Sequence, residues 1–214
     1  MSKQERAVRT RRDLVHAAAV AFEQYGYVQA TLATISDQAG VSTGALHFHF
    51  ENKAALAAAV EAAAYEQLRA VVCEACGSAE PALQALAEAS QEVSRLLRAN
   101  VVFRAGFQLN FDITRRSDLD LRHEWHACVQ NLIDKARDGG GLMRTVVPHD
   151  VVAVIVAATV GFGLLGRESR EWLSPNTLAG FWELLLPRLA AVPESPSGNS
   201  LVTADRSVTR QRTD

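Results

Sequence analysis

The chain has 214 residues, with 22 basic and 24 acidic side chains for a formal net charge of −2, and 48% of its residues are apolar. These are the proportions of an ordinary globular protein, and they exclude a collagen-like, wholly disordered or highly charged chain. Three cysteines do not form a disulfide framework in a chain this long, and the N-terminus MSKQERAVRTRRD lacks the apolar segment of a secretory signal. We therefore expect a cytoplasmic protein of one or two domains.

Helix signals dominate the whole chain, because alanine-rich stretches with helical spacing are frequent and strand signals are scarce. We expect an all-α fold. The first predicted helix runs from a Thr10 cap to a stop at Gly26, and two short helices follow at residues 32–39 and 42–48, with Thr31 and Ser42 as N-caps. Further helices are predicted at residues 53–74, 81–98, 101–110, 119–138, 149–167 and 175–191.

The two short helices are joined by Gly40-Val41-Ser42, the pattern of a helix-turn-helix. The glycine permits the sharp turn, and Ile35 and Leu46 can face a common core. The second helix is then exposed, and the small residues at its start allow a close approach to base edges in the major groove. A basic arm over residues 1–12, with five basic side chains against one acidic side chain, precedes this unit and suits phosphate unless it is simply a frayed terminus.

Residues 30–56, ATLATISDQAGVSTGALHFHFENKAAL, resemble the signature of the TetR-type regulators. The resemblance implies a three-helix DNA-binding unit at residues 1–53 and a helical ligand-binding and dimerisation domain at residues 54–192. The polar residues 193–214, rich in proline and serine at their start, are expected to be a disordered tail.

The same resemblance assigns DNA contacts. It implies that Thr31 contacts phosphate, that Thr43 and Gly44 meet base edges, and that His49 and Lys53 contact the DNA backbone. His47 departs from the pattern, because the family usually has at this position a tyrosine whose hydroxyl reaches phosphate. The predicted DNA-binding residues are Thr31, Ser42, Thr43, Gly44, Ala45, His47, His49 and Lys53.

Two later patches, VVFRAGFQLN at residues 101–110 and Glu124-Trp125, resemble the γ-butyrolactone autoregulator receptors, a TetR subgroup that controls secondary metabolism. This resemblance implies that Trp125 packs on a small lipid-like ligand and that Thr159 lies in a region lining the same cavity. A cavity for an acyl chain with a small polar head needs mostly apolar walls and a few directed polar groups. The predicted ligand-binding residues are Val93, Leu97, Phe107, Gln108, Trp125, Val129, Gln130, Thr159 and Phe162.

A homodimer is expected, because a twofold pair of recognition helices reads two half-sites. The segment 151–166 is apolar all round, more than one chain readily hides, and its 16 residues are too few to span a membrane. Gly161, Gly163 and Gly166 would permit close helix approach, although a monomer could also bury this helix internally. The predicted interface residues are Val152, Ile155, Val156, Gly163, Phe181, Trp182 and Leu185.

No catalytic, metal or cofactor motif is expected, and Cys73 and Cys76 form a single CxxC pair without a second. We predict a non-enzymatic repressor that binds a pseudo-palindromic DNA operator as a dimer and is released by a small hydrophobic molecule such as a γ-butyrolactone, controlling antibiotic genes. Alternatives with the same fold sense an antibiotic, a furan or butenolide, or thiol oxidation at Cys73 and Cys76. Alternatives from another class are a helical enzyme and a non-catalytic adaptor.

Overall fold

The computed structural model of the chain describes residues 2–111 and 117–191. Within these residues it contains helices only, apart from an isolated bridge between Leu142 and Ala190. The α-helices are α1 (Lys3–Gln29), α2 (Leu32–Gln38), α3 (Thr43–His49), α4 (Lys53–Gly77), α5 (Ala82–Ala99), α6 (Val101–Phe111), α7 (Leu121–Asp138), α8 (Pro148–Leu165) and α9 (Pro175–Leu189), and a short 3₁₀ helix, η1 (Arg170–Leu173), precedes α9. The predicted all-α fold is confirmed. The predicted disordered tail, residues 193–214, lies outside the described residues.

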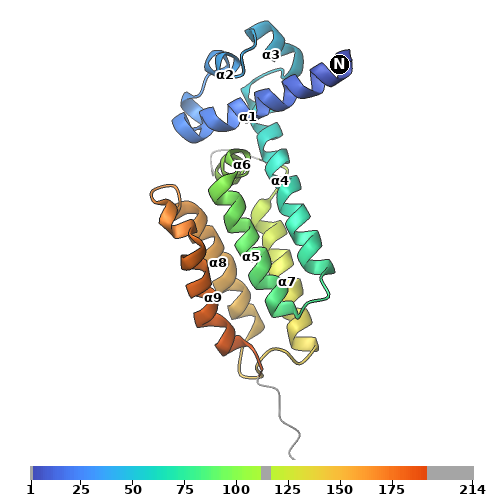
Figure 1. Cartoon of the computed structure of the whole chain (residues 1–214), viewed down its shortest axis with the longest axis vertical. Helices are drawn as coiled ribbons and strands as arrows, with labels where there is room; N and C mark the ends of the chain where they lie inside the picture. The colour runs from blue at the N-terminus through green and yellow to red at the C-terminus, as the bar shows by residue number, and fades with distance from the viewer. Residues whose placement is uncertain (1, 112–116, 192–214) are drawn as a thin grey trace, which may run out of the picture.

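The molecule is elongated and has two parts (Figure 1). A small unit made of α1, α2 and α3 lies across one end, and a longer bundle made of α5 to α9 extends from it, with α4 running from one part into the other. In this view α9 lies on one flank of the bundle and α4 on the other, with α5, α7 and α8 between them, and α7 packs against both α4 and α8.

Helix α1 differs from its prediction at both ends. It begins seven residues before Thr10, because Ser2 and Glu5 form a capping box in which each side chain accepts a hydrogen bond from the other residue's backbone N–H. The basic arm is therefore the helical N-terminal part of α1. At the other end Gly26, with a φ of 74°, interrupts the helix but does not end it.

Two hydrophobic cores meet on α4 and α6. The first core contains α1, α2 and α3 together with Leu56, Ala57 and Val60 of α4 and two residues of α6, Ala105 and Leu109. The second core fills the bundle and begins on α4 at residue 64. The two helices touch closely where they cross, since a Cβ on Gly106 would lie 2.4 Å from the Ala64 Cβ.

Helix α8 is long and apolar enough to cross a membrane by length and composition, with a mean hydropathy of 1.8. Only 28% of it is buried within its own chain. Exposed apolar residues on a helix of this kind, among them Val154, Leu164 and Leu165, indicate an association surface.

Candidate DNA-binding and effector sites

The turn between α2 and α3 is fixed by local caps. The hydroxyl of Thr31 accepts a hydrogen bond from the Thr34 N–H, and the hydroxyl of Ser42 accepts one from the Ala45 N–H, both at 3.1 Å. Gly40 has a φ of 67°, a conformation that other residues adopt at a cost. Ile35 and Leu46 are both fully buried. One face of α3 is therefore held against α1 and α2, and its opposite face points outward.

The outer face of α3 carries most of the predicted DNA-binding residues. Ser42, Thr43, Gly44 and His47 are exposed, whereas Ala45 and His49 are half-buried. The Thr43 hydroxyl lies 3.4 Å from the hydroxyl of Ser36 on α2, which orients it. The chain thus offers a surface of small side chains at the start of this helix.

Phe48 also lies on this outer face, although it was not among the predicted DNA-binding residues. Its side chain is 81% exposed, the largest exposed fraction among the large apolar residues of the described chain. The signal was available, because Leu46 and Phe50 occupy the buried side of the same short segment and residue 48 lies between them in the sequence. An aromatic ring exposed to this degree next to two histidines is typical of a contact surface.

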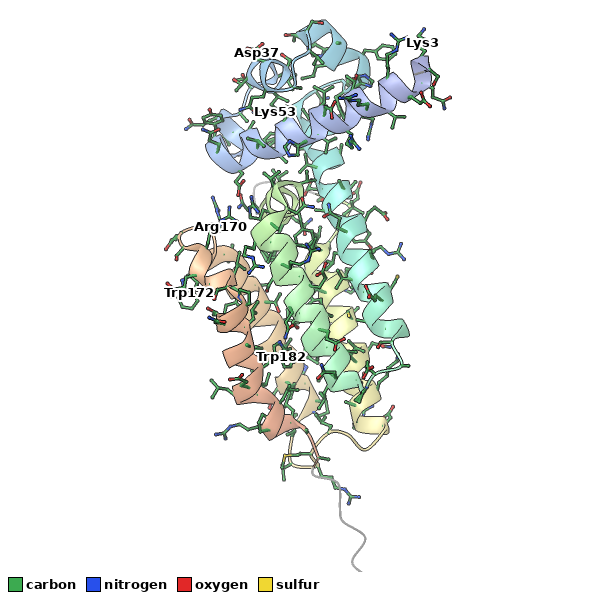
Figure 2. All side chains as sticks on the ribbon, in the orientation of Figure 1. Lys3, Asp37, Lys53, Arg170, Trp172 and Trp182 are labelled. Carbon is green, nitrogen blue, oxygen red and sulfur yellow. The ribbon has the colours of Figure 1, made fainter. Side chains whose placement is uncertain are left out.

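Lys53, predicted to contact the DNA backbone, has a structural role within the chain. Its ammonium donates to the carbonyl oxygens of Tyr27, Val28 and Ala30 at 2.9–3.0 Å, and it lies 4.8 Å from the centre of the Tyr27 ring. Figure 2 shows it where α4 meets the end of α1. All three N–H groups are therefore used inside the protein, and a phosphate contact from Lys53 would have to replace one of these bonds.

The basic part of α1 lies next to α3. The Arg11 guanidinium stacks over the ring of Phe50, the C-cap of α3, at 5.1 Å. Arg6, Arg9 and Arg12 are exposed on the same helix. Their positive charge extends the surface formed by α3 and favours an anionic partner.

The apolar residues predicted to bind a ligand are packed together in the second core. Buried members are Val93, Leu97, Phe107, Trp125 and Val129, and Phe162 is partly buried against them. Thr159 is buried, and its hydroxyl donates to the Ile155 carbonyl at 2.9 Å. The prediction that these residues share one neighbourhood agrees with this packing, whereas their ligand contact stays a prediction.

The two glutamines predicted to orient a ligand lie elsewhere. Gln108 lines a surface cleft with Glu23 and Arg104, where α6 faces the end of α1. Gln130 donates to the carboxylate of Asp134 at 2.9 Å on the same helix. Both are polar residues on amphipathic helices, and such residues usually lie on the side of the helix that faces solvent and not on the side that faces an internal cavity.

Two buried indole N–H groups, those of Trp125 and Trp182, have no hydrogen-bond partner among the described residues. Burying a donor without an acceptor costs about 1–3 kcal/mol, so such a group is informative wherever it occurs. Figure 2 shows that Trp182 of α9 points into the bundle. The sequence cannot reveal this feature, because only the fold decides whether an acceptor is near.

Helix α7 is tied to α4 next to Trp125. The Tyr65 hydroxyl of α4 donates to the Glu124 carboxylate at 2.9 Å, and Arg69 lies 3.8 Å from the same group. The hydrogen bond to Glu124 raises the pKa of the Tyr65 phenol, because it stabilises the protonated form. The residue before Trp125 is therefore connected directly to the helix that enters the DNA-binding unit.

The residues predicted to form the dimer interface do not share one environment in the single chain, and their contact with a second copy stays a prediction. Val152, Ile155 and Trp182 are buried within their own chain. Gly163 is also internal, since a Cβ there would lie 2.8 Å from the Phe107 ring, and Gly166 packs on Leu173 in the same way. The remaining predicted residues, Val156, Phe181 and Leu185, are half-buried. Because apolar residues occur on every side of this helix, the sequence pattern could not show which side faces the core.

The uncovered apolar flank of α8 and α9 is formed by other side chains. Val154 of α8 is 51% exposed and Leu184 of α9 is 76% exposed, and Leu164 and Leu165 are exposed at the end of α8. Gly161 leaves open space on its outer side. We define Val154, Gly161, Leu164, Leu165 and Leu184 as the outer flank.

An ion cluster joins the DNA-binding unit to the bundle. The Glu23 carboxylate of α1 accepts from Arg104 of α6 at 2.5 Å and from Arg170 of η1 at 3.4 Å. Both guanidiniums also donate to the carbonyl oxygens that end α5, those of Leu97 and Arg98. Arg170 lies just beneath α1 in Figure 2. The cluster thus joins four elements, α1, α5, α6 and η1, through Glu23 and the two arginines.

Comparisons with known proteins agree with this architecture. Residues 14–60 match the family described as bacterial regulatory proteins, tetR family. The chain is 32% identical to the A-factor receptor protein of Streptomyces griseus over 191 residues, which is 89% of this chain and 67% of that protein. It superposes on a crystal structure of a γ-butyrolactone receptor, an ArpA-like protein, with a TM-score of 0.77 and 29% identity, over 87% of this chain and 91% of the other. The TetR family protein CprB of Streptomyces coelicolor, solved in complex with its operator sequence, gives a TM-score of 0.75 with 29% identity over 87% and 91% of the two chains.

Proposed function

Because the chain belongs to the tetR family of bacterial regulatory proteins, in the group of the γ-butyrolactone receptors, we propose that it represses transcription by binding a pseudo-palindromic operator as a homodimer. A small hydrophobic molecule, a γ-butyrolactone with an acyl chain, releases it from DNA. The regulated genes are those of secondary metabolite synthesis, and the protein acts in the cytoplasm without catalysing a reaction. The DNA-binding unit is taken as residues 1–53 and the effector and dimerisation domain as residues 54–192.

The observation that carries the DNA-binding proposal is the exposed start of α3. Thr43 and Gly44 are exposed while Leu46 is fully buried, so this helix presents its first turn to a groove without leaving the core. Thr43 offers a hydroxyl to a base edge, and the Phe48 ring offers an apolar contact to a thymine methyl group. Thr31, Ser42, Ala45, His47, His49 and the arginines of α1 hold the phosphates on either side.

Replacement of Gly44 by leucine tests this proposal. A Cβ at Gly44 meets only the Ser42 hydroxyl at 3.9 Å, so the fold accepts a side chain there while the close approach to a base edge is lost. We expect Gly44→Leu to weaken operator binding at least 100-fold in a gel shift and to leave the thermal midpoint within a few degrees. The matched control is Gly77→Leu at the far end of α4, where a Cβ meets nothing within 4 Å. Unchanged operator binding by Gly44→Leu would favour an adaptor or an enzyme.

Dimerisation is assigned to the outer flank of α8 and α9. Its exposed apolar side chains would be costly to leave in water, and pairing with the same surface of a second copy removes them by a twofold operation. The half-buried Val156, Phe181 and Leu185 border this surface. A pair joined in this way carries two α3 helices, one for each half of a palindromic operator.

The effector is placed against Trp125, in the core formed by α5, α6, α7 and α8. A lactone carbonyl would accept a hydrogen bond from the buried Trp125 indole N–H, which has no acceptor among the described residues. The acyl chain would displace apolar contacts of Val93, Leu97, Phe107, Val129 and Phe162. Because these side chains are packed together, the ligand must separate them. A ligand that prefers the separated state lowers operator affinity, and operator DNA lowers ligand affinity by the same factor.

The identity of the effector is tested by titration. A synthetic γ-butyrolactone with an acyl chain, a butenolide, a furan and a panel of antibiotics are each added to the operator complex. We expect release by the lactone alone at the lowest concentration. Release by an antibiotic only would show that the chain senses an antibiotic and not a lactone, with the same fold. Deletion of the gene, followed by profiling of secondary metabolites, tests whether the protein controls secondary metabolite genes. An unchanged profile would contradict this part of the proposal.

A further inference from the structure

Cys73 and Cys76 of α4 lie close to Cys128 of α7, a cysteine that is distant in the sequence. Cys73 is exposed and Cys76 is half-buried on the last two turns of α4, and Cys128 is buried on α7. The Sγ atoms of Cys76 and Cys128 lie 3.9 Å apart although the two residues are separated by 52 positions. Cys76 is thus close to a thiol of another helix as well as to Cys73, its neighbour in the CxxC pattern.

We propose that Cys76 and Cys128 form a redox site, which a hydroperoxide oxidises to a disulfide between α4 and α7. The sulfur atoms are already in contact, and a disulfide bond is about 2.05 Å long, so rotation of the two side chains with a small adjustment of the helices joins them. The backbone around Cys76 is held in place, because the Lys135 ammonium of α7 donates to the Cys76 carbonyl at 2.6 Å. The two helices therefore keep the thiols together.

The two thiols take different parts in the reaction. Cys76 is only half-buried, so an oxidant in water reaches it, whereas Cys128 is 2% exposed. Burial raises the pKa of the Cys128 thiol to about 12, with a smaller contribution from the Cys76 sulfur. Cys128 therefore stays protonated and shielded, and Cys76 is oxidised first.

The chemistry balances in two steps. The Cys76 thiolate attacks one oxygen of hydrogen peroxide, the O–O bond breaks, and the departing hydroxide takes a proton and leaves as water, so that Cys76 becomes a sulfenic acid. The Cys128 sulfur then attacks the Cys76 sulfur, the S–O bond breaks, and the departing hydroxide leaves as a second water with the Cys128 proton. Two thiols have lost two hydrogens, and one peroxide has become two waters. A small dithiol such as dithiothreitol reverses the change.

The disulfide would fasten the helix that enters the DNA-binding unit to the helix that carries Trp125. Trp125 and Cys128 are three residues apart and share a face of α7. In Figure 1 α4 lies on the side of the bundle away from α9, so a dimer formed through the outer flank leaves the half-buried Cys76 of α4 accessible. This consequence rests on the proposed function: oxidation holds α4 against α7 in the ligand-free arrangement and lowers the response to the effector.

Peptide mapping of the full chain tests the disulfide without any reference to DNA. Reduced protein is treated with hydrogen peroxide and digested without reductant by trypsin and by a protease that cleaves after glutamate, which separates Cys73 from Cys76 at Glu74. We expect a Cys76–Cys128 peptide in the wild type and in Cys73→Ser, and its absence in Cys76→Ser and Cys128→Ser. The melting temperature should rise on oxidation in the first two proteins and fall again with dithiothreitol. A Cys73–Cys76 disulfide, or overoxidised Cys76 without the link to Cys128, would overturn the proposal.

The regulatory consequence is read on the operator complex. We expect oxidised wild type and oxidised Cys73→Ser to need at least tenfold more of the synthetic acyl γ-butyrolactone for release than their reduced forms, with no change in peroxide-treated Cys128→Ser. Equal lactone sensitivity of the two redox forms would overturn this consequence. If the reduced protein binds no operator, the proposed function fails, and the peptide map still decides whether the disulfide forms.

Discussion

Trp125 shows how a single buried group can connect stability with ligand binding. Its indole ring fills the core between helices, but its N–H has no acceptor among the described residues. A buried donor without an acceptor costs about 1–3 kcal/mol. A ligand that supplies an acceptor recovers this free energy, and such a recovery favours the ligand-bound state.

Trp125→Phe is expected to keep the stability of the protein within about 1.5 kcal/mol, because an unpaired donor is removed while most of the ring remains. The lactone concentration that releases the operator should rise at least tenfold, whereas operator affinity without lactone should not change. Urea unfolding and gel-shift titration measure the two effects. Trp182→Phe is the matched control, since it removes the other unpaired indole N–H on α9 and should leave the lactone response intact. A wild-type response from Trp125→Phe would remove Trp125 from the effector site.

At the level of single residues, sequence patterns predicted apolar positions better than polar ones. Val93, Leu97 and Val129 lie in one core, as expected from their helical spacing. Gln108 lines a cleft beside Glu23 and Arg104, and the Lys53 ammonium donates to carbonyl oxygens near the end of α1, so the surroundings of both come from distant segments. Such surroundings depend on how helices cross, and no local pattern encodes a crossing.

Besides α4, which runs through both parts of the molecule, the contact of α1 with α6 connects them. Glu23 of α1 accepts hydrogen bonds from Arg104 and Arg170, and both arginines bind the carbonyl oxygens at the end of α5. The Arg104 side chain is only 12% exposed, so its charge is poorly hydrated and depends on this carboxylate. A movement of α6 in the effector domain would therefore change the contacts that Glu23 of α1 makes.

Glu23→Gln is expected to destabilise the protein by about 1–3 kcal/mol, because the half-buried Arg104 loses its counter-charge. It should also reduce the factor by which lactone weakens operator binding. Chemical unfolding gives the first quantity, and operator affinity with and without lactone gives the second. Glu92→Gln is the control, since it breaks an exposed Glu92–Arg95 pair within α5 alone and should cost no more than about 1 kcal/mol with no effect on coupling. Equal effects of the two substitutions would contradict a coupling role for Glu23.

The helix boundaries could be predicted to within three residues for α2 to α9, because caps, glycines and prolines act locally. The start of α1 was missed for a similar reason. Thr10 is a plausible cap, but Ser2 and Glu5 form the better one, and the stronger cap fixed the boundary. The inward side of α8 remained undetermined by its sequence, which is apolar on every side.

In the whole molecule, the outer flank of α8 and α9 is the surface that favours association with a second copy of the chain. A leucine that is 76% exposed on α9 and a valine that is 51% exposed on α8 lie on helices that are otherwise packed against the bundle. Association would bury these side chains, with about 25 cal/mol gained per Å² of apolar surface removed from water.

Leu184→Glu is expected to convert the dimer to a monomer, because it places a charge at the centre of the proposed contact without touching the bundle core. Light scattering after size exclusion measures the change, and operator affinity should fall at least 100-fold with it. Val28→Glu is the matched control, an equally exposed apolar side chain of α1, and it should remain dimeric. A dimeric Leu184→Glu protein would move the interface to another surface.

The shared packing of α4 and α6 limits how far this protein can be treated as interchangeable modules. Leu56, Val60 and Leu109 complete the core beneath α1, so a fragment ending at residue 53 would expose the hydrophobic underside of its own three helices. A hybrid regulator that takes its DNA-binding unit from this chain should therefore also take Leu56, Val60 and Leu109 from it. It is also expected to melt in one cooperative transition, because α4 and α6 each contribute residues to both cores.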